Sequence, residues 1–412
     1  MKFKKPYIYN ALEGMNFQSF TEIQKKIIPD ALKGRDVIGV SETGSGKTHA
    51  FLLPIFDALL ANERRVQALI LAPTRELAEQ ILKMARELAK YTSEKIDIRI
   101  YTGGRDRDRE IERLKKSQPQ VVVGTPGKVH DLAVKENLLK IHTAKTLVID
   151  EADMALEIGF MNDLEAIAYA VGKEAQLMVF SATFPDHLRA FIRKSMHQPL
   201  EVVLNKKRLA GLDIRHRFIK AAPENRLKTL DKVLAAINPY LALIFANTKE
   251  DVELIASHLH QKDLDATYLH GDLRPRERKQ VLRDIAGLNV QYVVASDMAS
   301  RGIDIEGVSH VVNFAFPKDM NFYIHRVGRT ARMGHSGTAI TFYDDADEKA
   351  FDFLKKEDVM LDFCDVVDRG FVSKKSEAPV KEKRQKPKDK VKKVKPAYKK
   401  KYHAKQKRKR GN

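Results

Sequence analysis

The stretch VIGVSETGSGKTHAFLL, from Val37 to Leu53, decides how the first half of the chain folds. It begins with a short apolar run, continues through a glycine-rich turn and ends in an apolar segment long enough for a helix. The turn nearly matches the pattern G-x-x-x-x-G-K-[ST], in which backbone N–H groups surround phosphate oxygens at the start of a helix. Ser41 stands where this pattern has its first glycine. The stretch therefore predicts a strand, a nucleotide-binding loop and a helix.

The residue types in this loop suit phosphate binding. Gly44 and Gly46 let the backbone turn so that successive N–H groups point at phosphate oxygens. We expect Lys47 to reach the β- and γ-phosphates of ATP and the Thr48 hydroxyl to hold Mg²⁺. The loop residues predicted to contact the nucleotide are Ser41, Glu42, Thr43, Gly44, Ser45, Gly46, Lys47 and Thr48.

Apolar runs of four or five residues recur along the chain and alternate with segments of helical periodicity, such as 76–90 and 163–171. This alternation predicts α/β folding on parallel sheets, with ligands at the carboxyl ends of the strands. The first series of predicted strands comprises 37–40, 68–71, 121–123, 146–149 and 177–180, and a second series comprises 241–245, 292–295, 311–313 and 338–342.

Two series in a chain of 412 residues predict two tandem domains. We place the first domain at residues 1–205, a linker at 206–212 and the second domain at 213–372. Residues 373–412 are a lysine-rich tail with few large apolar residues, and this composition predicts disorder.

The net charge of +19 lies almost wholly in this tail, because residues 374–412 carry 19 lysines and arginines against three acidic residues. Such a tail attracts nucleic acid by counterion release, although it could also serve only as a solubilising segment. The single cysteine excludes an internal disulfide, and no apolar run has the length of a membrane span. We expect a soluble cytoplasmic protein without membrane association.

An acidic cluster, Asp150-Glu151-Ala152-Asp153, directly follows the predicted strand 146–149. We expect this strand to neighbour strand 37–40, so that Asp150 provides a second Mg²⁺ anchor and Glu151 polarises the attacking water. An isolated cluster of this kind could equally be a helix N-terminus satisfied by backbone donors. The Lys47 loop upstream favours the nucleotide site.

Together these motifs resemble the DEAD-box ATP-dependent RNA helicases of superfamily 2, and the resemblance covers about residues 3–345. It implies two RecA-like domains and ATP hydrolysis with Mg²⁺. It also implies that Thr21 and Gln24 read adenine, that Asp304 contacts the ATP ribose, and that Arg329 and Arg332 are catalytic arginine fingers alongside Lys47, Asp150 and Glu151. Residues implied to hold RNA are Pro73, Thr74, Arg75, Gly103, Gly104, Thr125, Pro126, Gly127, Asn247, Thr248, Gly271, Asp272 and Ser296, and those implied to couple hydrolysis to strand separation are Asp153, Ser181, Thr183, His325 and Arg326.

The sequence departs from the family pattern at several positions. Phe20 stands where proline is usual, Lys128 where arginine is common, Pro275 where glutamine is usual and Ala331 where glycine is usual. Lys128 keeps the charge but loses the guanidinium fork. The aromatic residue that stacks on adenine in the family would fall near residue 1, which leaves Phe3 as a candidate.

The resemblance predicts RNA-stimulated ATP hydrolysis coupled to local, non-processive separation of short RNA duplexes or remodelling of RNA–protein complexes. Contacts to phosphate and sugar imply little sequence specificity. The short N-terminus and basic extension are similar to those of bacterial cold-shock DEAD-box helicases. This similarity implies a role in ribosome assembly or RNA turnover, with ribosomal particles or RNA-decay proteins as partners. We expect the protein to be a monomer. A DNA translocase and an ATP-gated RNA clamp or annealing protein are the alternatives.

Overall fold

The computed structural model describes residues 1–41, 44–184, 186–204, 213–297, 305, 307–331, 336–367 and 370–374. The predicted linker and nearly all of the predicted tail lie outside these ranges. The domain boundaries given above therefore stay a prediction.

The first sheet is wholly parallel and has the strand order β3-β4-β2-β5-β6-β1-β7. We call this sheet and its covering helices the first lobe. Its strands are β1 (Val37–Val40), β2 (Ala68–Leu71), β3 (Ile98–Tyr101), β4 (Val121–Gly124), β5 (Thr146–Ile149), β6 (Gln176–Ser181) and β7 (Leu200–Val203). Every residue of β1, β2, β4 and β5 is buried, which explains their continuous apolar sequences.

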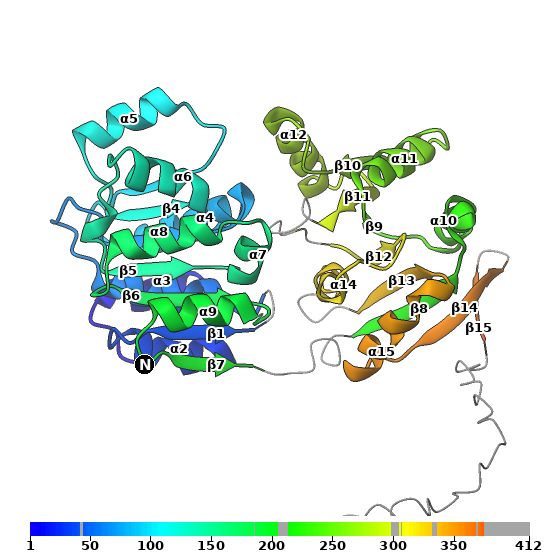
Figure 1. The fold of residues 1–412 in the computed structure, drawn as a ribbon, viewed down its shortest axis with the longest axis horizontal. Coiled ribbons are helices and arrows are strands. Elements are labelled where there is room, and N and C mark those ends of the chain that lie inside the picture. Colours follow the sequence, from blue (N-terminus) through cyan, green and yellow to red (C-terminus); the bar gives the residue numbers. More distant parts are fainter. Residues whose placement is uncertain are drawn as a thin grey trace, which may run out of the picture. The chain divides into compact units, whose positions relative to one another are not determined.

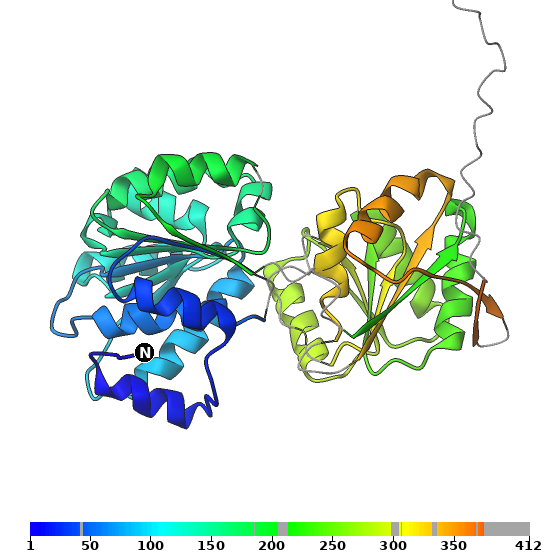
Figure 2. The same cartoon turned by 90° about the horizontal axis from the view of Figure 1, so that it is seen from below.

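Helices cover both faces of this sheet (Figures 1 and 2). One face carries α1 (Pro6–Gly14), α2 (Glu22–Ala31), α3 (Lys47–Ala58) and α4 (Arg75–Ala89). The other face carries α5 (Arg107–Lys116), α6 (Pro126–His130), α7 (Ala152–Glu157), α8 (Met161–Val171) and α9 (Asp186–Ser195). A π-helix at Asp131–Lys135 continues α6, and a single 3₁₀ turn lies at Ile141–Thr143.

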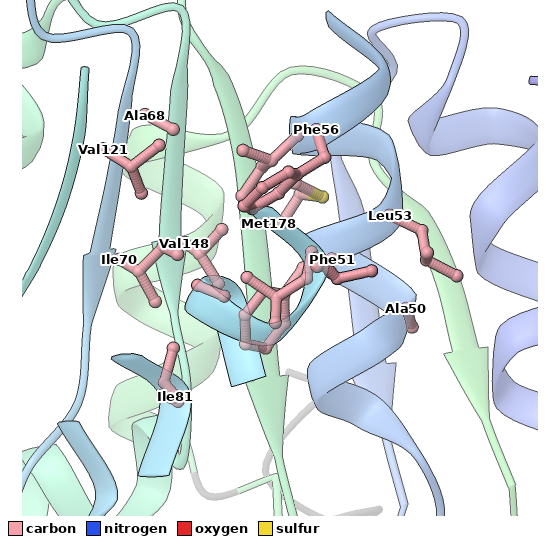
Figure 3. Packing of buried hydrophobic residues seen from close by; sticks show 14 of the residues in the cluster. Ala50, Phe51, Leu53, Phe56, Ala68, Ile70, Ile81, Val121, Val148 and Met178 are labelled. Atoms are coloured by element: carbon pink, nitrogen blue, oxygen red, sulfur yellow. The ribbon is translucent and has the colours of Figure 1, made fainter. Parts of the chain in front are cut away.

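Successive strand residues pack against opposite helix layers, as the two-residue period of a strand requires. Ala68 and Ile70 of β2 belong to the core beneath α3 and α4, whereas Leu69 and Leu71 belong to the core on the opposite face. Figure 3 shows the first of these cores, where Phe51 and other α3 side chains lie over the sheet. This packing fixes α3, and with it the loop that precedes α3, against the end of β1.

The second sheet forms a second lobe with its own helices, and its strand order is β10-β11-β9-β12-β13-β8-β14-β15. All neighbouring strands are parallel except β14 and β15, which form an antiparallel edge. The strands are β8 (Ile214–Lys220), β9 (Ala242–Ala246), β10 (Ala266–Leu269), β11 (Tyr292–Ser296), β12 (His310–Asn313), β13 (Gly337–Tyr343), β14 (Asp362–Val367) and β15 (Gly370–Ser373).

The helices of the second lobe also pack on both faces of its sheet. The helices α10 (Arg226–Ala236) and α11 (Lys249–His260) pack into one core, and α12 (Pro275–Ala286), α14 (Met320–Val327) and α15 (Glu348–Lys356) pack into the other. Short 3₁₀ turns precede α10 and α15, at Pro223–Asn225 and Asp345–Asp347. None of the helices described in either lobe has the length and apolarity needed to cross a membrane.

The predicted class of two α/β units on parallel sheets is confirmed, and all nine predicted strands are present. One expectation about neighbours is wrong. β5 does not adjoin β1, because β6 lies between them and pairs with both. This insertion places the end of β6, at Ser181, between the phosphate loop and the acidic cluster.

Burial of His216 makes the stability of the second lobe dependent on pH. His216 is 5% exposed on β8 and contacts the Tyr323 hydroxyl at 2.9 Å through Nδ1. Burial lowers the pKa of His216 from 6.5 to about 4. Because the unfolded chain binds the proton more tightly, the stability present above pH 6.5 is lost as the pH falls towards 4.

We therefore expect His216→Gln to reduce the acid-induced loss of unfolding free energy between pH 7 and pH 4 by about 3 kcal/mol. Urea denaturation followed by circular dichroism at both pH values measures this difference. His142→Gln, at an exposed position, is the matched control. Equal acid-induced losses in wild type and His216→Gln would contradict the assignment.

Candidate functional site

The phosphate-binding loop has the backbone that its glycines predict. Gly44 and Gly46 adopt left-handed conformations, with φ values of 82° and 95°. Ser41 is not among the residues with positive φ; its N–H donates to the Ser181 carbonyl at 3.1 Å, and its hydroxyl lies 2.7 Å from that of Ser45. Serine is therefore compatible with the first position of the loop, because the left-handed turns lie further along it.

Lys47, the first residue of α3, is buried beside acidic residues. Its Nζ donates to the Ser41 carbonyl at 2.9 Å and forms an ion pair with Glu151 Oε1 at 3.1 Å. Burial alone would lower the pKa of Lys47, but the charges of Glu151, Asp150 and Asp153 outweigh burial and raise it. Lys47 therefore stays a cation, which is the form that a phosphate ligand needs.

Gln24 connects α2 to the same loop. Its Oε1 accepts from the Thr21 N–H at 2.9 Å, and its Nε2 donates to the Gly46 carbonyl at 3.0 Å. A Cβ atom on Gly46 would lie 2.5 Å from Gln24 Nε2, so the contact requires glycine. The structure thus shows Gln24 bound to the phosphate loop, while its predicted contact with adenine stays a prediction.

The acidic cluster begins directly after β5, at the same end of the sheet as the loop. Asp150 is 3% exposed, and burial together with the Glu151 charge raises the pKa of Asp150 to about 7, against the opposing effect of Lys47. A buried carboxylate of this kind fits a Mg²⁺ ligand, because the cation would compensate its charge. Glu151 has a left-handed backbone with φ of 47°, a conformation that costs a non-glycine residue about 1–2 kcal/mol.

Asp153 joins the acidic cluster to the segment after β6. Its Oδ2 accepts from the Thr183 N–H at 2.8 Å and from the Thr183 hydroxyl at 2.7 Å, and its own N–H donates to Ser181 Oγ at 3.2 Å. Three of the predicted coupling residues are thus in direct contact. The intervening position of β6 in the sheet explains why they meet.

A second group of predicted residues surrounds Arg75 at the start of α4. Thr74 caps this helix by accepting the Leu77 N–H at 3.2 Å. The exposed Arg75 guanidinium lies so close to Gly103 and Gly104 that a Cβ atom on either glycine would come within 2.7 Å of it. Two glycines are therefore needed for Arg75 to lie across this backbone.

The turn after β4 contributes to the same surface. Its residues Thr125 and Gly127 line one groove with Pro73, Thr74, Arg75 and Gly103. The side chains of Pro73 and Pro126 are buried, so these prolines shape the backbone and do not present their rings to a ligand. The predicted RNA-holding segments of the first lobe thus lie together, although their contact with RNA stays a prediction.

In the second lobe Arg326 is 1% exposed and makes several internal hydrogen bonds. It forms a bidentate pair with Asp297, and its guanidinium also donates to Asn247 Oδ1 at 2.7 Å and to the Ala315 carbonyl at 2.9 Å. The Asn247 amide in turn donates to the Phe316 carbonyl at 2.9 Å. Arg326 and Asn247 therefore hold the ends of neighbouring strands together, and their side-chain polar groups are engaged within the lobe.

The remaining predicted residues of the second lobe differ in exposure. Thr248 is exposed and caps α11, and Asp272 pairs with Lys249 at 2.6 Å. Gly271 is exposed, Ser296 and His325 are half-buried, and Arg329 is buried just after α14. The predicted residues Glu42, Thr43, Asp304 and Arg332 lie outside the described residues.

Comparison with known proteins identifies the family. Residues 21–191 match the DEAD/DEAH box helicase family, and residues 225–334 match the helicase conserved C-terminal domain. The chain belongs to the DEAD-box family of ATP-dependent RNA helicases. It is 45% identical to the DEAD-box ATP-dependent RNA helicase CshB of Listeria monocytogenes, over 90% of this chain and 84% of that protein.

Two further similarities extend over most of this DEAD-box helicase. It is 42% identical to CshB of Bacillus subtilis over 96% of this chain and 93% of that one. The structure of S. cerevisiae Dbp5 bound to RNA and ADP BeF3 superimposes with a TM-score of 0.77 at 29% identity, covering 87% of this chain and 93% of that one. The RecA-like fold expected from the sequence is confirmed.

The structure describes the surroundings of two residues compared above with the family pattern, Ala331 and Phe3. Ala331 adopts a left-handed backbone with φ of 56°, a conformation that glycine reaches without the steric cost of a Cβ atom. Phe3 is 5% exposed and packs in the core against Tyr9 and Phe20. Its burial disfavours Phe3 as the residue that stacks on adenine.

Asp297 and Asn313 lie beside the Arg326 guanidinium and were not predicted as site residues from the sequence. Both residues end or directly follow a buried strand, β11 or β12, and this position was the available signal. Their pairing with Arg326 could not be predicted from the distances between these residues along the sequence, because it depends on the strand order of the second sheet.

We expect Arg326→Lys to lower the unfolding free energy by about 2–4 kcal/mol, because lysine cannot replace a fork-shaped set of buried hydrogen bonds. Urea denaturation at pH 7 measures the change. Arg276→Lys, at an exposed position on α12, is the matched control. A change no larger than that of the control would contradict the structural role of Arg326.

Proposed function

We propose that this DEAD-box helicase binds ATP and Mg²⁺ at the carboxyl end of the first sheet and couples RNA-stimulated hydrolysis to local separation of short RNA duplexes. One observation carries the proposal. The buried cation Lys47 lies 3.1 Å from Glu151, at the meeting point of the phosphate loop and the acidic cluster. This arrangement provides a phosphate ligand and a carboxylate within one site.

In the proposed site, the loop N–H groups and Lys47 bind the phosphates of ATP. Thr48 and Asp150 would hold Mg²⁺, which neutralises phosphate charge when bound. Glu151 orients the attacking water and accepts hydrogen bonds from it. Binding of a phosphate to Lys47 would leave the Glu151 carboxylate available for this task, because the two side chains otherwise neutralise each other.

Arg329 and Arg332 are proposed to complete the site as arginine fingers on the γ-phosphate, with Asp304 on the ribose. Arginine fingers can accelerate phosphoryl transfer by about 10³- to 10⁵-fold. RNA bound by both lobes would favour the closed arrangement, so RNA and ATP would increase each other's affinity. The contacts of Asp153 with Ser181 and Thr183 provide a short path between the ATP site and the rest of the lobe.

RNA is proposed to lie along the groove lined by Arg75, Gly103, Thr125 and Gly127. These residues offer a guanidinium, small side chains and backbone groups, which suit phosphate and sugar better than base edges. Sequence-independent binding follows, and contacts with the 2′-hydroxyl would distinguish RNA from DNA. Binding of Dbp5 to RNA and ADP BeF3 supports both sites by similarity.

We further propose a cytoplasmic role in ribosome assembly or RNA turnover, with ribosomal particles or RNA-decay proteins as partners of a monomer. The resemblance to bacterial cold-shock DEAD-box helicases implies this role, and the similarity to CshB proteins supports the RNA helicase activity on which it depends. A DNA translocase would be stimulated equally by DNA. An RNA clamp or annealing protein would hold RNA with a non-hydrolysable ATP analogue without separating a duplex. Unwinding is favoured because the Asp153–Thr183 contact joins the acidic cluster to the segment that the resemblance implies couples hydrolysis to strand separation.

We expect Lys47→Ala and Glu151→Gln each to reduce RNA-stimulated ATP hydrolysis at least about 10²-fold, since each removes a group from the proposed reaction centre. Phosphate release measured with saturating single-stranded RNA tests this, with DNA of the same sequence as the nucleic-acid control. Glu174→Gln, at an exposed position of the same lobe, is the matched variant. Undiminished turnover in either site variant would refute the proposed site.

Truncation after Val372 should weaken RNA binding and flatten its dependence on salt, because the removed residues carry nearly all of the net positive charge. Turnover at saturating RNA should stay largely intact. Anisotropy titrations of labelled RNA over a range of salt concentrations measure the slope. Replacing the tail by a neutral segment of equal length separates charge from length, and an unchanged slope would show that the tail acts elsewhere.

A further inference from the structure

A partly buried ion pair lies in the wall of the proposed RNA groove. Lys128 Nζ, on α6, is 2.8 Å from Glu110 Oε2, on α5, and the side chains are only 12% and 11% exposed. Both Glu110 carboxylate oxygens are shielded from solvent, and apart from this ion pair neither has a hydrogen-bond partner among the described residues. Among the ion pairs of the described residues, Lys128 is the cation that compensates Glu110.

The same face of α5 makes a second connection to this wall. Arg107, one turn before Glu110, pairs with Asp131 and donates to Glu136 Oε1 at 2.9 Å. Asp131 and Glu136 belong to the π-helix that continues α6 and to its end. Together with the Lys128–Glu110 pair, three ion pairs thus hold α5 against the segment after the Thr125 turn. Arg107, Lys128 and Asp131 all line the groove.

Arg75 and Lys128, two cations of this groove, have different electrostatic surroundings. A shielded carboxylate without a partner is costly, and beside RNA it would also repel phosphate. The exposed Arg75 guanidinium can bind phosphate directly, whereas the Lys128 ammonium is already directed at Glu110. A compact ammonium suits this contact, because it meets a single carboxylate oxygen.

We propose that Lys128 is a positioning residue for RNA binding, which neutralises Glu110 and fixes α5 beside the Thr125 turn, and that it is not itself a phosphate ligand. The inference rests on the proposed RNA groove. It assigns to Lys128 a role that depends mainly on Glu110, so replacing both residues should restore the RNA affinity that replacing Lys128 alone lowers.

A double-mutant cycle tests this dependence in the full-length chain. The variants are Lys128→Met, Glu110→Gln and the double variant, and the readout is the affinity for a labelled single-stranded RNA with ADP and beryllium fluoride. We expect Lys128→Met to weaken RNA binding about tenfold or more, because it leaves a shielded charge unpaired. The double variant should return to within about threefold of wild type.

The dependence of affinity on salt provides a second readout. The neutral pair releases no counterion, so the double variant should keep the wild-type slope of log affinity against log salt. Glu110→Gln alone should steepen the slope by about 0.7, because the freed Lys128 can then reach a phosphate. A direct phosphate contact would instead leave the double variant as weak as Lys128→Met, with a slope flatter by about 0.7, and this outcome would overturn the proposal.

Two controls keep the outcomes distinct. Lys115→Met removes an exposed lysine of α5 and measures the general effect of one lost charge, which should not couple to Glu110→Gln. If Lys128→Met fails to fold, recovery of folding and of RNA affinity in the charge-reversed pair Lys128→Glu with Glu110→Lys supports the proposal, and no recovery overturns it.

Failure of the proposed function gives a different result. If this groove does not bind RNA, Arg75→Met and Lys128→Met will both leave RNA affinity unchanged. If Arg75→Met weakens binding and the double variant at positions 110 and 128 is not rescued, the groove is correct and the role of Lys128 is wrong.

Discussion

The ion pair between Lys47 and Glu151 is the contact on which the arrangement of the first lobe depends. A lysine buried at the start of a helix is tolerable only beside compensating carboxylates, and these come from a strand that does not adjoin β1. The loop, the end of β5 and the end of β6 must therefore meet at one place. The position of β6 brings Ser181 and Thr183 into that meeting, so the nucleotide site and the proposed coupling segment share one set of contacts.

The second lobe also contains a buried cation beside compensating polar groups, but this cation is fully engaged by protein partners. Its buried arginine, Arg326, binds Asp297 and Asn247 at the ends of neighbouring strands and has little capacity left for a ligand. Exposed cations and buried cations therefore differ in the partners that they can reach. Exposed Arg75 is proposed to bind RNA, whereas Arg326 is bound within its lobe and Lys128 is proposed to position α5. Side-chain burial separates these roles where residue type does not.

Much of the fold could be predicted because fully buried parallel strands have continuous apolar sequences, as β1, β2 and β5 do. The strands β3, β7, β8, β10, β14 and β15 were missed, since each is partly exposed and lacks this signal. The residue types of the phosphate loop and acidic cluster also predicted a nucleotide site. The partners of Arg326 and the pairing of Lys128 with Glu110 could not be predicted, because they depend on strand order and on helix contacts far apart in the sequence.

The two glycines beneath Arg75, Gly103 and Gly104, affect which substitutions this position of the arginine tolerates. A methyl group at Gly103 or Gly104 would occupy space that the guanidinium fills. An alanine there changes no charge, yet it would force the flexible Arg75 guanidinium to leave this position. A substitution that looks conservative at Gly103 or Gly104 would therefore act through Arg75. Its effect depends on the space around the glycine as well as on the chemistry of the new side chain.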